Sequence, residues 1–239
     1  MNDLPMFFVF GLPRSGTTWL AALLAEQNKD WMIIHEAHKH DFDYDYWCPF
    51  QPWRADEYVN GKRHTRMVEY TKRKMKNATG YGEVTPRARY FSATLQRHYP
   101  QAKCVHLVRD PRHAVRSMIQ LGYYAPNSRP HRRVTPNNGK WSRIEQTSWA
   151  WAFGHNRIRQ TCPDFVRLED LLTDWETMSA LASTLGVSCD KANWEERTQK
   201  PMNVSNQTHL GWEKWTPSEQ KTLITMCGSE ARQYGYLAE

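Results

Sequence analysis

A glycine-bounded loop near the start of the chain has the residue types of a phosphate site. Residues 11–18 read Gly-Leu-Pro-Arg-Ser-Gly-Thr-Thr and follow the apolar run 6–10. A buried strand, a glycine loop and a helix start bring backbone N–H groups and the positive end of a helix dipole to one point. The spacing matches the phosphate loop G-x-x-x-x-G-K-[ST], except that Thr17 stands at the lysine position and Arg14 supplies a cation inside the loop. The pattern predicts a site for a phosphate-like group other than the β- and γ-phosphates of ATP.

A second anion site is predicted where the apolar run in residues 103–108 meets a helix start. Asp110 is suited to cap that helix and Pro111 to occupy its first turn, so Arg109 stands at the carboxyl end of a strand. Ligands bind at that edge in open α/β sheets. Ser117, further along the helix, is either a ligand group or a serine that bonds a carbonyl one turn earlier. Asp110 could also hold magnesium after such a strand, but capping explains it without a metal.

These two segments resemble the donor-binding motifs of sulfotransferases that use 3′-phosphoadenosine 5′-phosphosulfate (PAPS). Residues 13–18 fit the family form P-[RK]-[ST]-G-T-[TS] at every position, and R-D-P-x-x-x-x-x-S is matched by Arg109 and Ser117. The resemblance implies that the first motif binds the 5′-phosphosulfate, that the second binds the 3′-phosphate, and that no metal takes part. The residues it assigns to the donor are Arg14, Ser15, Gly16, Thr17, Thr18, Arg109, Ser117 and, in a later segment, Lys200.

Sulfuryl transfer also needs a base for the acceptor proton and a cation for the charge on the leaving phosphate oxygen. Arg14 is the predicted catalytic cation. Glu36 follows the second expected strand, at the sheet edge where the phosphate loop opens. The resemblance implies a base there in tyrosylprotein and heparan-type sulfotransferases, which use glutamate, whereas cytosolic small-molecule enzymes use histidine. We predict Glu36 as the base, with Glu83, His35 and His38 as alternatives.

Two positions depart from the family pattern. Gly-Glu-Val-Thr-Pro at 82–86 is similar to G-E-K-[TS]-P, but Val84 replaces a lysine that touches the transferring group. That contribution is missing or comes from a nearby cation, with Arg87, Arg89 and Lys39 as candidates. The segment 167–171 is similar to Y-E-D-L, with Leu168 in place of tyrosine.

The order of apolar and amphipathic segments predicts one α/β domain over residues 1–239, with a mostly parallel central sheet flanked by helices. Expected strands are 6–10, 31–35, 81–84, 103–108 and 164–168. Expected helices are 17–27, 56–75, 87–98, 111–121, 143–159, 175–185 and 217–234. Two long loops are predicted at the active site. The aromatic-rich 41–53 is expected to form a wall of the acceptor site, and the basic 122–142 is either a mobile loop over the active site or a plain surface loop.

Composition narrows the class of protein further. The net charge of +7 suits either a multiply negative donor or a nucleic acid. Five cysteines without a C-x-x-C pair, no visible signal peptide and no long apolar run predict a cytoplasmic protein without a membrane span. The histidines around Glu36 form His-Glu-Ala-His, one residue short of the zinc pattern H-E-x-x-H, so no metal site is predicted.

Two other classes of protein fit the sequence less well than a sulfotransferase does. A nucleoside-triphosphate kinase or hydrolase is opposed by Thr17 at the lysine position. A nucleic-acid-binding protein would need its basic residues in one stripe with interleaved aromatics, and they are dispersed, so no specific nucleic acid is expected. The acceptor stays open among carbohydrate, tyrosine and small phenols or alcohols.

Overall fold

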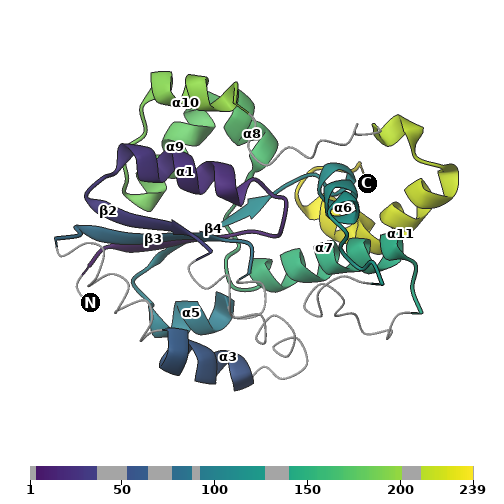
Figure 1. Cartoon of the computed structure of the whole chain (residues 1–239), viewed down its shortest axis with the longest axis horizontal. Coiled ribbons are helices and arrows are strands. Elements are labelled where there is room, and N and C mark those ends of the chain that lie inside the picture. The colour runs from purple at the N-terminus through teal and green to yellow at the C-terminus, as the bar shows by residue number, and fades with distance from the viewer. Residues whose placement is uncertain are drawn as a thin grey trace.

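Five parallel strands form the centre of the molecule (Figure 1). The computed structural model describes residues 4–36, 53–63, 77–87, 92–126, 140–200 and 211–238. The sheet order is β2-β3-β1-β4-β5, and every neighbouring pair is parallel. The strands are β1 Met6–Phe10, β2 Trp31–His35, β3 Gly80–Thr85, β4 Lys103–Val108 and β5 Phe165–Arg167.

Alternate residues of the central strand β1 enter two separate cores. Phe8 and Phe10 join one apolar cluster, while Phe7 and Val9 join the other. Since side chains alternate across a strand, a strand that is apolar throughout must be covered on both faces. The predicted class, α/β with a parallel sheet flanked by helices in one domain, is confirmed.

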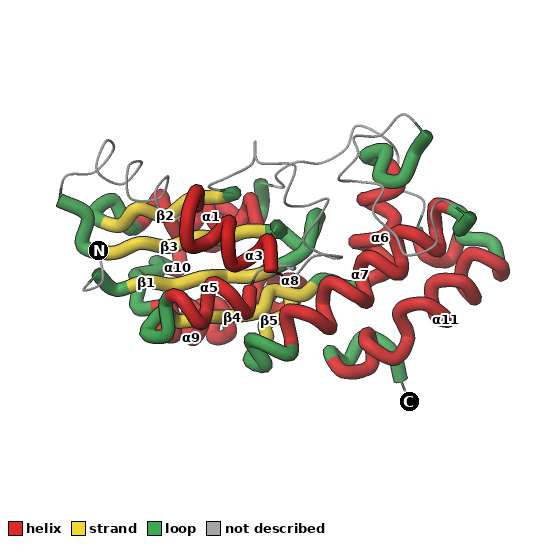
Figure 2. Tube along the Cα trace, turned by 90° about the horizontal axis from the view of Figure 1, so that it is seen from below, coloured by secondary structure: helices red, strands yellow, loops and turns green. Residues whose placement is uncertain are grey.

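Helices cover both faces of the sheet (Figure 1). One cluster includes residues from α1 (Thr17–Gln27), α8 (Leu168–Thr173), α9 (Trp175–Leu185) and α10 (Lys191–Thr198). The other includes residues from α3 (Trp53–Glu57), η1 (Tyr58–Arg63), α5 (Ser92–His98), α6 (Pro111–Gln120), α7 (Arg143–Arg159) and α11 (Pro217–Gln233). Figure 2 shows α6, α7 and α11 packed together at one side of the sheet.

N-terminal capping residues explain where α6, α7 and α11 start. Asp110 accepts the Arg112 N–H at the head of α6, with Pro111 in the first turn, as predicted. α7 begins with a capping box between Ser142 and Glu145, and α11 with another between Thr216 and Glu219. These caps satisfy N–H groups that have no partner inside the helix.

Most expected elements agree with the structure, and the differences are local. The strand expected at 164–168 stops at Arg167, because α8 starts directly at Leu168. The helix expected at 87–98 is described only from Ser92, and the one expected at 56–75 starts at Trp53 and is described as far as Arg63. Helices α8 and α10 and the short turn Trp212–Lys214 were not expected.

The two predicted active-site loops lie largely outside the described residues. Of the segment 41–53 only the last residue is described, and of 122–142 only 122–126 and 140–142 are. None of the helices described is both long and apolar enough to cross a bilayer.

Candidate functional site

The parallel order brings the carboxyl ends of four strands to one sheet edge. The phosphate loop follows β1, Glu36 follows β2, Arg87 lies just beyond β3 and Arg109 follows β4. β1 lies between β3 and β4, so the loop at 11–16 has a neighbouring strand end on each side. This is the edge at which open α/β sheets bind ligands.

Ser15 closes the phosphate loop internally. Its hydroxyl donates to the Leu12 carbonyl and accepts the Leu12 N–H over 2.9 Å, and its own N–H donates to the same carbonyl over 3.1 Å. The side chain is buried. Ser15, predicted as a donor ligand, therefore uses its hydroxyl to shape the loop.

Gly16 allows the loop to turn into α1. It has φ +84°, and an added Cβ would lie 2.4 Å from Leu168 Cδ1. Leu168, which replaces the family tyrosine, is thus buried against the loop from the first turn of α8. Only glycine fits a left-handed position with no room for a side chain.

Arg14 connects the two predicted anion motifs. Its Nε donates to Ser117 Oγ over 2.8 Å, and its carbonyl accepts from Arg109 Nη1 over 2.8 Å. Burial lowers the pKa of both guanidinium groups from the usual value, although arginine stays charged at neutral pH. An anion bound between them would offset the cost of removing two cations from water.

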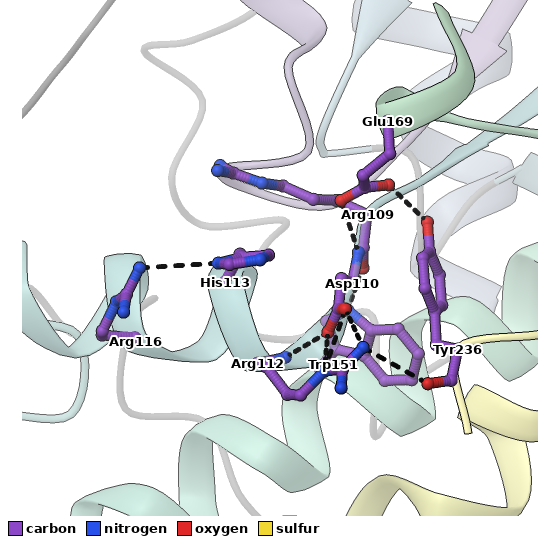
Figure 3. Close-up of polar contacts among 8 residues, drawn as sticks. All are labelled: Arg109, Asp110, Arg112, His113, Arg116, Trp151, Glu169 and Tyr236. Atoms are coloured by element: carbon purple, nitrogen blue, oxygen red, sulfur yellow. Dashed lines mark hydrogen bonds and ion pairs between the residues drawn. The ribbon is translucent and has the colours of Figure 1, made fainter. Parts of the chain in front are cut away.

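The turn that carries Arg109 is held by side chains from two other parts of the chain and by Arg112 of the same turn (Figure 3). Trp151 Nε1 donates to the Arg109 carbonyl over 3.1 Å, and the Asp110 N–H donates to Glu169 Oε1 over 3.1 Å. Arg112 Nε donates to both carboxylate oxygens of Asp110, each over 2.9 Å. The carboxylate of Asp110 therefore serves the cap and an ion pair, in agreement with its predicted capping role.

The two threonines of the loop converge on β2. Thr17 Oγ1 lies 3.1 Å from His35 Nε2, and Thr18 Oγ1 lies 3.3 Å from the same nitrogen. Both threonines stand in the first turn of α1, where backbone N–H groups point toward a ligand. His35, one of the alternative bases, thus links the loop hydroxyls to the end of the second strand.

Glu36 directly follows β2, at the same sheet edge as the phosphate loop. It has φ +51°, and its Oε2 lies 3.3 Å from Arg87 Nε. Among the described residues other than glycine, only Arg14, Glu36 and Tyr124 have positive φ. Backbone conformations of this kind concentrate at functional sites. Arg87, one of the cations considered in place of the missing lysine, lies beside the predicted base.

Glu83 has a different environment from Glu36. It lies within β3, beside Phe8 of β1 in the strand register, and is 1% exposed. Its Oε2 accepts from the Tyr81 hydroxyl over 3.2 Å. This placement favours Glu36 over Glu83 as the group that meets an acceptor.

Lys200, predicted as a donor ligand, contacts a carboxylate of the preceding helix. Its ammonium is exposed and pairs with Glu196 of α10, one turn earlier. The segment 201–210 that follows it is outside the described residues, as are His38, Lys39 and Arg89. In the described ranges, no group of three or more His, Cys, Asp or Glu side chains is placed to hold a metal ion.

The residues that hold the Arg109 turn in place were not predicted from the sequence. Glu169 is the glutamate of the segment similar to Y-E-D-L, so the family pattern singles it out. Its contacts with Asp110 and Tyr236 could not be predicted from the sequence. Trp151 and Tyr236 carried no signal, because eleven tryptophans and eleven tyrosines are spread along the chain.

A parallel α/β sheet with a strand–loop–helix cradle and two half-buried arginines at one edge is the architecture of P-loop-like proteins. The family model of the sulfotransferase domain matches residues 7–178, and the chain belongs to this family.

Solved structures agree with the fold. A sulfotransferase from Alicyclobacillus acidocaldarius has 16% identity and a TM-score of 0.55, covering 96% of this chain and 93% of its own. The sulfotransferase domain of the Synechococcus PCC 7002 olefin synthase has 18% identity and a TM-score of 0.55, with 95% and 94% covered. The sulfotransferase domain from the curacin biosynthetic pathway has 14% identity and a TM-score of 0.54, with 99% of both chains covered. No curated protein matches the chain significantly.

Proposed function

We propose that this sulfotransferase moves a sulfuryl group from PAPS to an acceptor hydroxyl or amine and releases 3′,5′-ADP (PAP). The observation that carries the proposal is the contact of Arg14 with both Ser117 and Arg109. It joins two anion motifs that are far apart in the sequence, as a donor with two separate phosphate groups requires.

Each motif has a distinct part in binding the donor. Arg14, the loop amides and the hydroxyls of Thr17 and Thr18 surround the 5′ side, where charge grows during transfer. Arg109 and Ser117 supply charge-assisted bonds to the 3′-phosphate. Ser15 and Gly16 shape the loop rather than contribute side chains.

In the proposed transfer step, Glu36 is the general base. Its carboxylate accepts the proton of the acceptor group, the acceptor oxygen or nitrogen bonds to sulfur, and the bond from sulfur to the phosphate oxygen breaks. The leaving oxygen keeps the electron pair, and Arg14 and the loop amides stabilise its charge. Arg87, 3.3 Å from Glu36, holds the carboxylate in place and supplies a cation where the family lysine is replaced by Val84.

The proposal leaves carbohydrate, tyrosine and small phenols or alcohols as acceptors. Two of the similar structures are domains from an olefin synthase and from the curacin pathway, so small biosynthetic alcohols belong in the panel to be screened. We also propose a reducing, cytoplasmic location, in keeping with Cys104, Cys162, Cys189 and Cys227, which are all free thiols.

Ligand binding tests the donor class. PAP at a hundredfold over its dissociation constant should raise the free energy of unfolding by about 2.7 kcal/mol. ATP with magnesium, and a short oligonucleotide, should raise it much less. Equal thermal shifts from PAP and from ATP with magnesium would contradict PAPS as the donor, and a larger shift from the oligonucleotide would support the nucleic-acid class instead.

A further inference from the structure

The segment that follows α11 returns to the edge of the sheet and contacts the Arg109 turn (Figure 3). Tyr236 donates its hydroxyl proton to Glu169 Oε2 over 2.8 Å. The other oxygen of Glu169 accepts the Asp110 N–H over 3.1 Å. One carboxylate therefore bridges the Tyr236 phenol and the backbone beside the predicted phosphate-binding arginine.

The peptide group between Arg109 and Asp110 is held at both of its polar atoms. Its carbonyl accepts from Trp151 Nε1, and its N–H donates to Glu169. The orientation of this peptide sets the backbone of Arg109 and therefore the direction of its side chain. From this backbone the guanidinium reaches the Arg14 carbonyl, 2.8 Å from Nη1.

Tyr236 is itself held firmly. Its carbonyl accepts from Arg112 Nη2 over 3.4 Å, and the guanidinium carbon of Arg167 lies 6.0 Å from the centre of its ring. Burial and the neighbouring Glu169 raise the pKa of the phenol above its usual range. The hydroxyl thus keeps its proton and acts as a donor to Glu169.

Tyr234, two residues earlier, offers a close comparison. Its hydroxyl donates to Glu230 Oε1 over 2.7 Å, and its ring packs edge-on against His106 and His155 in the core. Burial raises the pKa of this phenol as well. The two tyrosines share a segment and a carboxylate partner, but only the Tyr236 hydroxyl donates to the carboxylate that holds the Arg109 turn. The Tyr234 ring packs edge-on against Trp151, a contact that Tyr234→Phe keeps.

We propose that Tyr236 and Glu169 are positioning residues for the donor site: they hold the Arg109–Asp110 peptide so that Arg109 is aligned for the 3′-phosphate of the donor. This inference rests on the proposed function, since it assigns the phosphate to Arg109. Neither residue needs to touch the donor, because each acts through the backbone beside Arg109.

Replacing one hydroxyl tests the proposal. Tyr236→Phe should weaken PAP binding about three- to tenfold, the usual effect of losing one hydrogen bond in a connected set. The KM for PAPS should rise by a similar factor, while kcat at saturating donor stays near the wild-type value. Tyr234→Phe, the matched control, should leave PAP affinity and the KM for PAPS unchanged, although it lowers thermal stability.

A double-variant cycle separates positioning from a general loss of stability. If Tyr236 acts through Glu169, Tyr236→Phe combined with Glu169→Gln should weaken PAP binding no more than Glu169→Gln alone. Additive losses would show that Tyr236 acts by another route and would overturn the proposal.

The remaining outcomes are also decisive. Unchanged PAP affinity in Tyr236→Phe, or equal losses in Tyr234→Phe and Tyr236→Phe, would overturn the positioning role while leaving the donor assignment intact. Failure of the wild-type protein to bind PAP would instead overturn the proposed function, and the positioning role with it.

Discussion

Arg14 donates its Nε–H to Ser117 Oγ over 2.8 Å, across a separation of 103 residues. The contact joins the loop after β1 to the middle of α6, and Arg109 completes it by donating to the Arg14 carbonyl. Arg14, the cation predicted for the 5′ side of the donor, is therefore hydrogen-bonded to Ser117, the serine predicted for the 3′ side. A donor that occupies both sites must share or replace this bond.

Ser117→Ala removes this bond and one predicted phosphate ligand. We expect PAP binding to weaken by about 1 kcal/mol, roughly fivefold, the net contribution of one hydrogen bond. Titration calorimetry measures the change. Ser183→Ala, at an exposed helical serine of α9, serves as the control and should bind PAP like the wild type.

Arg109→Ala should reduce donor binding far more strongly. Loss of charge-assisted bonds to a desolvated phosphate costs about 2–5 kcal/mol. Arg157→Ala removes an equal charge from an exposed position of α7 and should change PAP affinity little. Wild-type affinity in Arg109→Ala, measured by calorimetry, would show that Arg109 does not bind the 3′-phosphate.

Glu36→Gln keeps the size of the side chain but cannot accept the acceptor proton. Single-turnover transfer should slow by about 10²–10⁴-fold, the usual effect of losing a general base, while PAP affinity stays nearly constant. Glu83→Gln is the comparison, and its buried position predicts a loss of stability rather than of chemistry. If Glu36→Gln transfers at the wild-type rate and Glu83→Gln, His35→Ala or His38→Ala does not, the base is the residue whose loss stops transfer.

Gly16→Ala should destabilise the fold through two separable effects. A left-handed conformation costs a residue with a Cβ about 1–2 kcal/mol, and at Gly16 the new methyl group would also collide with Leu168. Gly122→Ala has a similar φ of +76° with no atom within 4 Å of the new Cβ, so it isolates the backbone cost. Thermal denaturation should rank Gly16→Ala well below Gly122→Ala, and equal melting temperatures would contradict the close packing of Leu168 on the loop.

A buried histidine pair predicts loss of stability in acid. His106 Nε2 lies 2.7 Å from His155 Nδ1, and both side chains are buried. Burial and Arg159 lower the pKa of His106 to about 3, and burial and His106 lower that of His155 well below its usual value. Both are neutral in the folded state, whereas the unfolded chain binds protons below about pH 6.5. Stability is therefore complete above this pH and falls as the pH decreases toward 3.

Each histidine should lower the free energy of unfolding by about 1.4 kcal/mol per pH unit below pH 6.5, or about 2 kcal/mol at pH 5. Urea denaturation at pH 7, 6 and 5 measures this slope. His155→Gln should reduce the slope, because one buried imidazole then remains to bind a proton on unfolding. An unfolding free energy that stays constant from pH 7 to pH 5 would contradict neutral histidines in the core.

The sequence by itself determined the elements that depend on residues close together in the chain. The strand at 6–10, the phosphate loop, the helix at 17–27 and the cap of α6 by Asp110 depend on hydrophobic period, glycine spacing and neighbouring capping residues, all of which lie within a few positions. The sheet edge that gathers Arg14, Glu36 and Arg109 follows from the parallel arrangement that these elements impose.

Only the tertiary structure decided which polar groups meet. It buries Glu83 within β3 and leaves Glu36 partly exposed after β2, uses the Ser15 hydroxyl inside the loop, and pairs Lys200 with Glu196 on the surface. It also brings Tyr236 to Glu169, 67 residues away along the chain. Such contacts depend on how remote segments pack, and a buried polar group bonds with whichever partner that packing places within reach.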